Sequence, residues 1–457
     1  MMTTVTEKRL IENFVARFSA KALEMDKITP AEYERYNVKR GLRNADGTGV
    51  LVGLTTIGNV HGYIVDEGER VSVPGKLSYR GIDVEDLVRG FQAERRTGYE
   101  ETAFLLLFGS LPAAAELAEF RAVLDEVRDL PAGFTENMIL KAPSRDIMNK
   151  LARCVLASYS YDDKADDADI PNNLRQGIEL IARFPTMTAY AYQAKVHYHE
   201  GRSLFLHNIK SGLSTAGNFL HLIRSDSEFT RLEEETLDLC LVLHAEHGGG
   251  NNSAFTVHVV TSSGTDAYSA IAAGVGSLKG PKHGGANVKV TEMMEDLKQN
   301  VRDPGSEEQV KEYLRRVLRR EAYDRTGLIY GVGHAVYTLS DPRAVLLKAK
   351  ARELAKEKGR EDEFLLYELV ENLAPAVFAE VKDSKKSISI NVDFYSGFVY
   401  RMLDIPHELF TPLFAIARVA GWTAHRLEEL TSGGRIMRPA FKSVAEKRNY
   451  VPLAERG

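Results

Sequence analysis

Helical periodicity runs through most of this chain, and it limits the possible folds more than any other feature. Apolar residues recur every three or four positions in segments that begin and end at Gly, Pro, Asp or Ser. The strand–helix alternation of a parallel sheet is missing, which excludes a Rossmann or P-loop enzyme. The pattern predicts helices at residues 8–27, 98–108, 113–127, 173–184, 233–244, 267–278, 307–321, 342–357, 364–381 and 409–430.

Residues 47–73 have a different texture. Glycines punctuate β-branched stretches such as residues 51–52 and 55–57, which predicts short strands or hairpins. Charge density rises at residues 292–325 and 348–363, which indicates a smaller and more exposed domain inserted late in the chain. We therefore expect a nearly all-α fold with short β-hairpin elements close to the N-terminus.

Composition narrows the class of protein. The 457 residues carry 59 Lys and Arg against 64 Asp and Glu, a net charge of −5, which argues against a nucleic-acid partner. An apolar run of about 20 residues and a signal peptide are both missing, so we expect no membrane partner and a cytoplasmic location. Two cysteines without a CxxC motif fit a reducing compartment.

Three segments place a histidine beside glycines: HAEHGGGN around His247, GPKHGGAN around His283, and GVGH ending at His334. Glycine allows a ligand to approach the backbone closely, and imidazole donates, accepts or carries charge near neutral pH. In NVDFYSG, Asp393 lies in an apolar and aromatic setting, where desolvation can tune its basicity. Together these segments are typical of an active site.

The ordered motifs HAEHGGGNNSAF, GPKHGGAN, GVGHAVYTLSDPRA, NVDFYSG and FAIARVAGW resemble those of the citrate synthase family, which includes 2-methylcitrate synthases. The similarity begins at LSYRGID, residues 77–83, and ends near Arg438. It implies that an acyl-CoA carbon condenses with the keto carbon of oxaloacetate, that the thioester is then hydrolysed, and that no cofactor is needed.

The resemblance also implies catalytic roles. By match to the family, Asp393 is the base that takes the α-proton of the acyl-CoA, and His283 donates to the thioester oxygen. His334 resembles the residue that polarises the keto carbonyl of oxaloacetate, and His247 resembles a second oxaloacetate contact.

Three arginines match family positions that bind the oxaloacetate carboxylates: Arg343, Arg418 and Arg438. A guanidinium binds a carboxylate through two parallel hydrogen bonds, which an ammonium group cannot do. In the family the last of these arginines reaches the active site of the other subunit. The resemblance therefore implies a homodimer whose active sites are completed across the interface.

The segment Gly331, Val332 and Gly333 resembles the acyl-CoA loop of the family, whose free backbone N–H groups meet polar atoms of adenine and pantetheine. Family members often carry a basic residue soon after the third histidine, where this chain has Ala335 and Thr338. Which basic residues hold the CoA phosphates is therefore open. Lys282 and Lys289 are candidates, although each is more simply a solvated surface lysine.

The family fold implies a large helical domain, residues 1–285 and 397–457, and a small domain, residues 286–396, with the active site between them. We expect closure around oxaloacetate to assemble the site.

Two other classes of protein stay open. The first is a metallohydrolase that uses His244, Glu246 and His247 or His197, His199 and Glu200, although neither set has HExxH spacing. The second is a non-catalytic helical scaffold. Within the enzyme class, a 2-methylcitrate synthase or a dual-specificity enzyme is the alternative, because one methylene changes binding by only about 1–3 kcal/mol.

Overall fold

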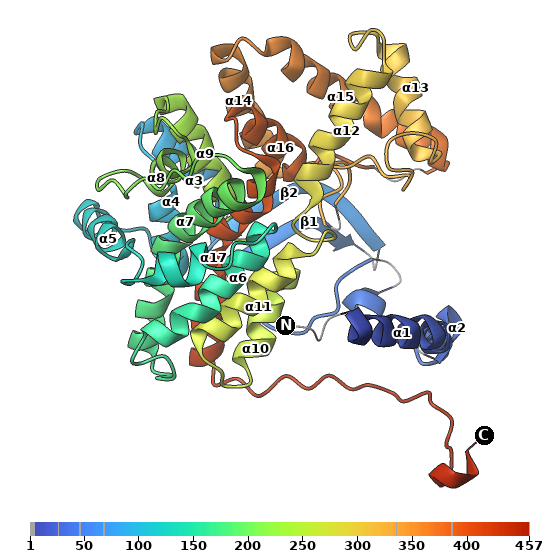
Figure 1. The fold of residues 1–457 in the computed structure, drawn as a ribbon. Helices are drawn as coiled ribbons and strands as arrows, with labels where there is room; N and C mark the ends of the chain where they lie inside the picture. The colour runs from blue at the N-terminus through green and yellow to red at the C-terminus, as the bar shows by residue number, and fades with distance from the viewer. Residues whose placement is uncertain are drawn as a thin grey trace. The chain divides into compact units, whose positions relative to one another are not determined.

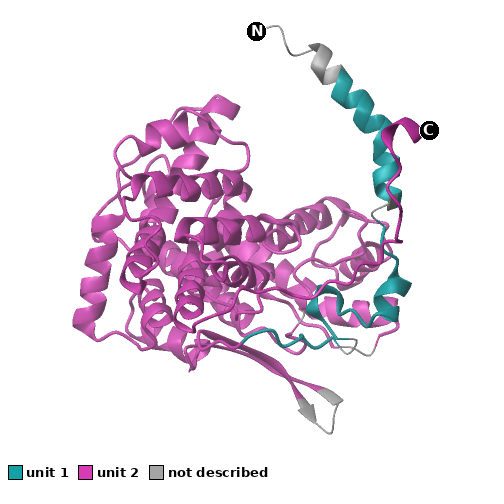
Figure 2. Cartoon of the chain, turned by 90° about the horizontal axis from the view of Figure 1, so that it is seen from below, with its two compact units in different colours: residues 1–53 teal, residues 54–457 magenta. Residues whose placement is uncertain are grey.

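The computed structural model describes residues 5–25, 27–44, 47–66, 69–334, 336–384 and 387–456. Residues 1–53 and residues 54–457 form two compact units (Figure 2). The first unit contains α1 (Val5–Met25) and α2 (Pro30–Arg35). The helix that the periodicity predicts at residues 8–27 is therefore confirmed as α1.

The second unit is built mainly from helices that surround a shared apolar core (Figure 1). They are α3 (Val84–Ala93), α4 (Tyr99–Phe108), α5 (Ala114–Val127), α6 (Ile147–Ser158), α7 (Ile170–Glu200), α8 (Thr215–Ile223), α9 (Arg231–His244), α10 (Asn252–Thr261), α11 (Ala267–Lys279), α12 (Ala286–Asn300), α13 (Glu307–Leu318), α14 (Pro342–Glu357), α15 (Glu361–Lys382), α16 (Val392–Met402) and α17 (Phe410–Thr431). The expectation of a nearly all-α fold is confirmed.

The sequence underestimates one helix. The predicted helix at residues 173–184 stops before Pro185, because proline removes a backbone donor and usually ends a helix. In the structure α7 continues through Pro185 and is 31 residues long. Burial of α7 on both sides of Pro185 stabilises the continuous helix against the local cost of the proline.

A small antiparallel sheet lies close to the site and confirms the β-hairpin predicted in residues 47–73, although the two β-branched stretches named there lie outside its strands. Residues 51–52 and 55–57 are not in strands. The strands are β1 (Gly58–Asp66), β2 (Glu69–Tyr79) and β3 (Ile82–Asp83), in the order β1-β2-β3. Gly58 pairs with Tyr79, and the register shifts between His61 and Tyr63.

The sheet holds two segments that carry predicted site residues. A Cβ atom on Gly75 would lie 2.2 Å from the Ser340 carbonyl oxygen, so only glycine allows residues 336–340 to approach β2 this closely. The Tyr79 hydroxyl donates to the carbonyl oxygens of Val242 and Glu246, at 3.0 and 3.2 Å. The sheet thus fixes both the end of α9 and the segment after His334.

Helix α17 is buried along most of its length and packs against α4, α7, α9, α10 and α11 (Figure 1). A helix that is apolar on all sides belongs in the core. A Cβ atom on Gly421 would lie 2.4 Å from the Ala245 carbonyl oxygen. The glycine therefore lets α17 approach the chain after α9, which brings Arg418 next to the first histidine motif.

Candidate active site

Six of the predicted site residues gather in one region of the second unit, mostly at helix ends. His247 lies between α9 and α10, His283 precedes α12, His334 precedes α14, Arg343 and Asp393 lie in the first turns of α14 and α16, and Arg418 lies in the middle of α17. The rings of His247 and His334 are 5.3 Å apart. The Arg418 charge lowers the pKa of His283, and the Arg343 charge opposes the raised pKa of Asp393, so these four residues share one electrostatic environment.

Arg418 is a buried cation with donors to spare. Its Nε donates to the His244 carbonyl oxygen at 2.7 Å, and its guanidinium lies 4.8 Å from the Phe414 ring centre. Among the described residues, its two terminal nitrogens are buried and have no hydrogen-bond partner. Burial lowers the pKa of Arg418 to about 10, so the group stays charged at neutral pH. A fork of this kind requires an anionic ligand, and a carboxylate matches it in shape.

Arg343 is held from its own helix end. Asp341 is the N-cap of α14 and accepts from the Arg343 backbone N–H at 3.0 Å, while Pro342 occupies the first helical position. The same carboxylate receives Arg343 Nε and Nη2 at 3.0 and 2.7 Å, and also the Val392 N–H at 3.2 Å. Asp341 therefore ties Arg343 to the start of α16, one residue before Asp393.

His247 is a neutral histidine beside these cations. Burial lowers its pKa well below the usual value, and the charges of Arg343 and Arg418 lower it further. Its Nε2 is buried and has no hydrogen-bond partner among the described residues. The ring is thus free to hydrogen bond a polar ligand that Arg418 and Arg343 attract.

His334 has its tautomer set by the backbone. The N–H groups of Val336 and Tyr337 both point at His334 Nδ1, each at 3.1 Å. A backbone N–H only donates, so Nδ1 accepts and the neutral ring carries its proton on Nε2. Tyr337 stacks on the ring at 4.8 Å and fixes its plane. Nε2–H is therefore a positioned donor.

His283 has the opposite tautomer for the same reason. The Ser253 N–H points at His283 Nε2 at 3.3 Å, and the Ser253 hydroxyl lies 3.0 Å from the same atom. Nε2 accepts, so the proton of the neutral ring is on Nδ1. Trp422 Nε1 donates to the Ser253 hydroxyl at 3.0 Å and holds it in place. Burial, and then the Arg418 charge, lower the pKa of His283 to about 4, so the ring is neutral at pH 7.

Asp393 combines a helix-start position with a raised pKa. Asn391 caps α16 by accepting from the Asp393 N–H at 3.0 Å. A helix N-terminus favours a negative charge, as does nearby Arg343. Burial outweighs both and raises the pKa of Asp393 to about 6. Among the described residues, the influences on this pKa are burial and the charges of Arg343 and Asp341, and a hydrogen bond to the carboxylate is not one of them, which leaves it available as a base.

The glycine loop before His334 is tied to the segment before Asp393. Gly331 and Gly333 have positive φ angles of 76° and 91°, which glycine adopts without strain. The Gly333 N–H donates to the Ser389 carbonyl oxygen at 2.7 Å, and the Val332 N–H donates to Ile329 at 3.3 Å. The expectation that this loop presents free N–H groups is therefore wrong for Val332 and Gly333. Their assignment to acyl-CoA binding stays a prediction.

Arg438 is not brought to the other residues within this chain. It is exposed on the extended segment after α17, which is tied to the end of α10 by a 3.1 Å hydrogen bond from the Met437 N–H to the Ser262 hydroxyl. Its predicted role requires a second copy of the chain.

The positions considered for CoA phosphate contacts differ in their exposure and in their partners. Ala335 lies outside the described residues. The Thr338 hydroxyl is buried and has no partner among the described residues. Lys282 is exposed, whereas Lys289 pairs with Glu292 at 2.8 Å.

The sequence missed the residues that position the predicted site residues. Asp341 and Ser253 act through Arg343 and His283, and the signal for Asp341 was present as an Asp-Pro pair at a helix start. Ser253 gave no signal, because its contact with His283 spans 30 residues.

The metal-site alternative finds no support at its own motifs. His244 Nδ1 lies 2.8 Å from the Cys240 carbonyl oxygen, and Glu246 Oε1 lies 2.9 Å from His425 Nε2. In the described ranges, the group whose ligand atoms converge is His258, His425 and Glu428. None of these three residues belongs to either motif, and only His258 is near one of them in the sequence.

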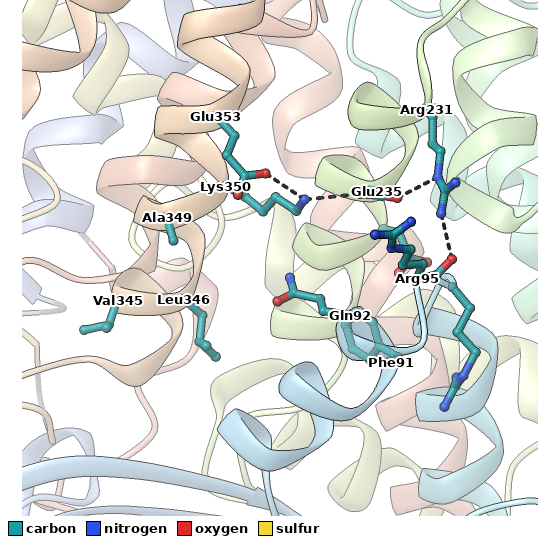
Figure 3. Close-up of a pocket in the computed structure, with 12 residues that line it drawn as sticks. Phe91, Gln92, Arg95, Arg231, Glu235, Val345, Leu346, Ala349, Lys350 and Glu353 are labelled. Atoms are coloured by element: carbon teal, nitrogen blue, oxygen red, sulfur yellow. Dashed lines mark hydrogen bonds and ion pairs between the residues drawn. The ribbon is translucent and has the colours of Figure 1, made fainter.

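A cavity of about 830 Å³ opens between α3, α9 and α14, away from these residues (Figure 3). Its charged lining is internally paired: Glu235 receives Arg231 Nε at 2.8 Å and Lys350 Nζ at 3.1 Å. None of the predicted site residues lines it. The cavity lies beside the place where α14, which carries Arg343, packs against α9 through the Lys350–Glu235 ion pair.

Comparison with known proteins decides the family. A family model described as citrate synthase, C-terminal domain, matches residues 45–440. The chain belongs to the citrate synthase family. It is therefore an enzyme, a transferase of the condensing acyltransferase type.

The relatives include both activities that the sequence left open. A citrate synthase from Synechocystis sp. is 37% identical and covers 84% of this chain and 88% of its own length. A 2-methylcitrate synthase from Shewanella oneidensis is 33% identical and covers 84% of this chain and 94% of its own length.

Solved structures that resemble this fold are also citrate synthases. Citrate synthase from Pyrobaculum aerophilum has a TM-score of 0.73 and 30% identity over 89% of this chain and 94% of its own. The ternary complex of citrate synthase from Thermoplasma acidophilum with carboxymethyl coenzyme A and oxaloacetate has a TM-score of 0.73 and 25% identity over 92% of this chain and 99% of its own.

Among the residues that the structure describes, no helix is both long and apolar enough to span a membrane.

Proposed function

We propose that this enzyme condenses acetyl-CoA with oxaloacetate and water to give citrate and CoA. The observation that carries the proposal is the Arg418 guanidinium, whose two buried terminal nitrogens have no partner among the described residues. Oxaloacetate supplies two carboxylates, one for this fork and one for Arg343, and His247 Nε2 is positioned to bind it between them. The family supports the same substrates, since the Thermoplasma acidophilum relative was solved with oxaloacetate and a CoA derivative.

The first step is removal of a proton from the methyl carbon of acetyl-CoA. Asp393 takes this proton, and His283 Nδ1–H donates to the thioester oxygen where the negative charge of the enolate develops. A carboxyl group with a pKa of about 6 is ionised at pH 7 and is a stronger base than an exposed aspartate. A neutral imidazole donates without giving up its proton.

The second step forms the carbon–carbon bond. His334 Nε2–H donates to the keto oxygen of oxaloacetate, which makes the keto carbon electrophilic. The enolate carbon attacks this carbon, and the keto oxygen takes up the His334 Nε2 proton; the proton that Asp393 removed later restores His334. Water then adds to the thioester carbon of the bound intermediate, the carbon–sulfur bond breaks, and CoA leaves as the thiol.

The preferred acyl-CoA is tested by release of free thiol from acetyl-CoA and from propionyl-CoA, each with and without oxaloacetate, in the presence of a chelator. We expect oxaloacetate-dependent release that is faster with acetyl-CoA. A higher kcat/KM with propionyl-CoA would assign the enzyme as a 2-methylcitrate synthase. No release with either substrate would contradict the proposal and support the scaffold alternative.

The second part of the proposal is domain closure. The large domain comprises residues 1–285 and 397–457, and the small domain comprises residues 286–396. The cavity lined by α3, α9 and α14 supports this division, because α14 of the small domain meets α9 of the large domain there through the Lys350–Glu235 ion pair, beside open space that a shift of α14 would fill (Figure 3). X-ray scattering of the free and oxaloacetate-bound enzyme should differ in radius of gyration. Identical profiles would reject closure.

The third part is a homodimer whose sites are completed by Arg438 of the partner subunit. Co-expression of Asp393→Asn chains with Arg438→Ala chains tests it. A mixed dimer then holds one site with both residues intact, so about a quarter of the sites regain activity. If Arg438 acted within its own chain, every site would lack one residue and activity would stay absent.

A cytoplasmic location stays a prediction of the sequence.

A further inference from the structure

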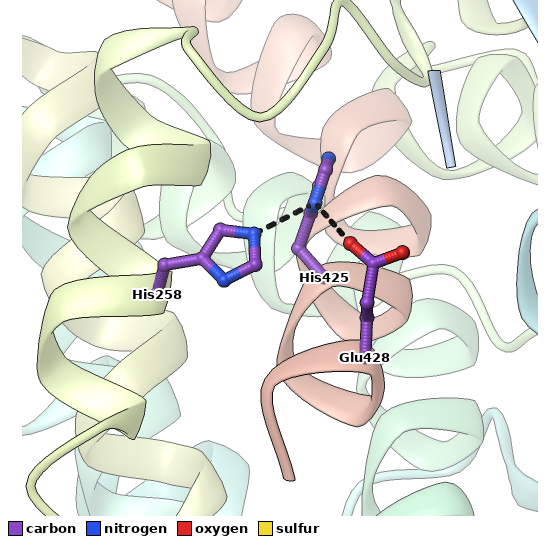
Figure 4. A group of neighbouring side chains, drawn as sticks. All are labelled: His258, His425 and Glu428. Atoms are coloured by element: carbon purple, nitrogen blue, oxygen red, sulfur yellow. Dashed lines mark hydrogen bonds and ion pairs between the residues drawn. The ribbon is translucent and has the colours of Figure 1, made fainter. Parts of the chain in front are cut away.

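A second cluster of ligand-type side chains lies behind the first histidine motif, between α10 and α17 (Figure 4). We call His258, His425 and Glu428 the α10–α17 cluster. His258 Nε2 lies 3.0 Å from His425 Nδ1, and Glu428 Oε2 lies 3.9 Å from the same His425 atom. His258 is 8% exposed and His425 is fully buried. The proposed mechanism uses none of the three.

Each member of the cluster is held from outside by a further group. His258 Nδ1 lies 2.9 Å from Glu429 Oε2, and His425 Nε2 lies 2.9 Å from Glu246 Oε1. Ionised carboxylates only accept, so both imidazoles donate outward to them. Metal-binding histidines have this arrangement, in which one nitrogen faces the ion and the other donates to a carboxylate.

The third member is fixed in the same way. Glu428 Oε1 receives the Thr56 N–H at 2.7 Å and the Thr56 hydroxyl at 2.8 Å. Its second oxygen, Oε2, is buried and has no hydrogen-bond partner among the described residues. Two nitrogen lone pairs and one carboxylate oxygen therefore face one another in a buried space.

Such a group favours a cation in addition to Arg80, whose charge acts on Glu428 and Glu246 from the Thr56 side. A single proton shared between the two imidazoles would satisfy the nitrogens, but it would leave Glu428 Oε2 without a hydrogen bond. A metal ion satisfies all three atoms. Zinc ligands at about 2.0–2.1 Å in tetrahedral geometry lie about 3.3 Å apart, and the observed 3.0 and 3.9 Å flank this spacing.

We propose that His258, His425 and Glu428 form a binding site for Zn²⁺. Two imidazole nitrogens and one carboxylate oxygen are the donor set that zinc prefers in proteins. The surrounding carboxylates of Glu246 and Glu429 add negative charge, which favours a divalent cation in a buried place.

The site also bears on the oxaloacetate loop, residues 246–250. Glu246 links His425 to this loop by accepting the Gly248 N–H. A Cβ atom on Gly249 would lie 3.5 Å from His425 Cε1 and 3.8 Å from His258 Nε2, so the loop runs directly past the cluster. Bound Zn²⁺ therefore fixes the loop that carries His247. This consequence rests on the proposed function, and we expect a lower KM for oxaloacetate when the site is filled.

The test measures binding before activity. Purified full-length enzyme is stripped with chelator, dialysed, and titrated with Zn²⁺ by calorimetry and with Co²⁺ by visible absorption. We expect one tightly bound ion per chain and the absorption bands of tetrahedral Co²⁺. Glu428→Gln keeps an oxygen for Thr56 but replaces the ligating oxygen by an amide nitrogen, so it should weaken Zn²⁺ binding more than about 100-fold. Glu429→Gln acts only through His258 and should weaken binding about 10- to 100-fold.

His221→Gln is the matched control, because this imidazole lies outside the cluster and contacts the Asn208 carbonyl oxygen. It should bind Zn²⁺ as the parent does. Equal binding in Glu428→Gln and the parent, or no binding in the parent, would overturn the site and leave a shared proton as the link between the two imidazoles. If Zn²⁺ binds but no thiol is released from either acyl-CoA, the proposed function fails while the metal site stands.

Discussion

The acyl side of the site, His283 and Asp393, and the keto-acid side, Arg343 and Arg418, solve different electrostatic problems. The keto-acid side keeps its charges although they are buried. Burial lowers the pKa of Arg418 only to about 10, so the group remains a cation at neutral pH. The acyl side is made of groups brought close to neutrality, with pKa values of about 4 for His283 and about 6 for Asp393. In the proposed mechanism, one side holds charge and the other moves a proton.

Burial produces both outcomes, and the ordinary pKa of each group decides between them. Desolvation is the largest influence on the pKa of Arg418, His283 and Asp393 alike. An arginine tolerates it because its ordinary pKa is far above neutrality, whereas a histidine or a carboxylate is pushed toward its uncharged form. The same dry environment therefore gives binding on one side and acid–base chemistry on the other.

The largest effect should come from Asp393→Asn, which removes the base and leaves the keto-acid side intact. We expect kcat to fall by about 10²- to 10⁴-fold, the usual contribution of a positioned base. Oxaloacetate affinity, measured by calorimetry without acyl-CoA, should stay within a few-fold of the parent. Loss of oxaloacetate binding in this variant would show that the two sides are not separate.

Stability provides a control for that variant. The folded pKa of Asp393, about 6, lies above its ordinary value of 3.8, so the folded state favours the protonated form. The resulting stabilisation is complete below pH 3.8 and is lost as the pH rises through 6. At pH 7 the ionised carboxylate costs up to about 3 kcal/mol. Asp393→Asn should therefore melt no lower than the parent at pH 7.

Arg418→Lys should have the next largest effect, now on the keto-acid side. Lysine keeps the charge but replaces a planar fork by a single point, and charged hydrogen bonds contribute about 1.5–3 kcal/mol. We expect the KM for oxaloacetate to rise about 10- to 100-fold, while the KM for acyl-CoA at saturating oxaloacetate changes little. An unchanged oxaloacetate KM would reject Arg418 as a carboxylate ligand.

The pH profile separates the two sides without a mutation. At saturating oxaloacetate, kcat/KM for acyl-CoA should fall below pH 6, because protonated Asp393 is no longer a base. At pH 5 the rate should be about tenfold lower than its plateau. His283, with a pKa of about 4, stays neutral over this range and adds no second limb. The acidic limb should vanish in Asp393→Asn, and its persistence there would assign it to another group.

The sequence predicted the helices, and the residues that meet at the site, better than the groups that hold those residues in place. Motifs placed His247, His283, His334, Arg343, Asp393 and Arg418, and the structure brings these six together. The tautomers of His283 and His334 were out of reach, because they depend on which backbone N–H faces each ring. Periodicity stopped α7 at Pro185 because it measures local preference, whereas burial on both sides of the proline is a property of the whole fold.

The smallest effect should come from Ser253→Ala, which tests how the acyl side fixes its donor. The variant removes the hydroxyl beside His283 Nε2 but keeps the Ser253 backbone N–H, so the proton stays on Nδ1. The variant also removes the hydroxyl contacts with Trp422 Nε1 and Asn251 Oδ1, but only the contact with His283 touches the proposed donor. Loss of one neutral hydrogen bond at His283 predicts a kcat about 2- to 10-fold lower, with the KM for oxaloacetate unchanged. Thr256→Ala, on the exposed side of the same helix, should be silent. A kcat loss above a hundredfold would mean that the hydroxyl, and not the backbone, sets the tautomer of His283.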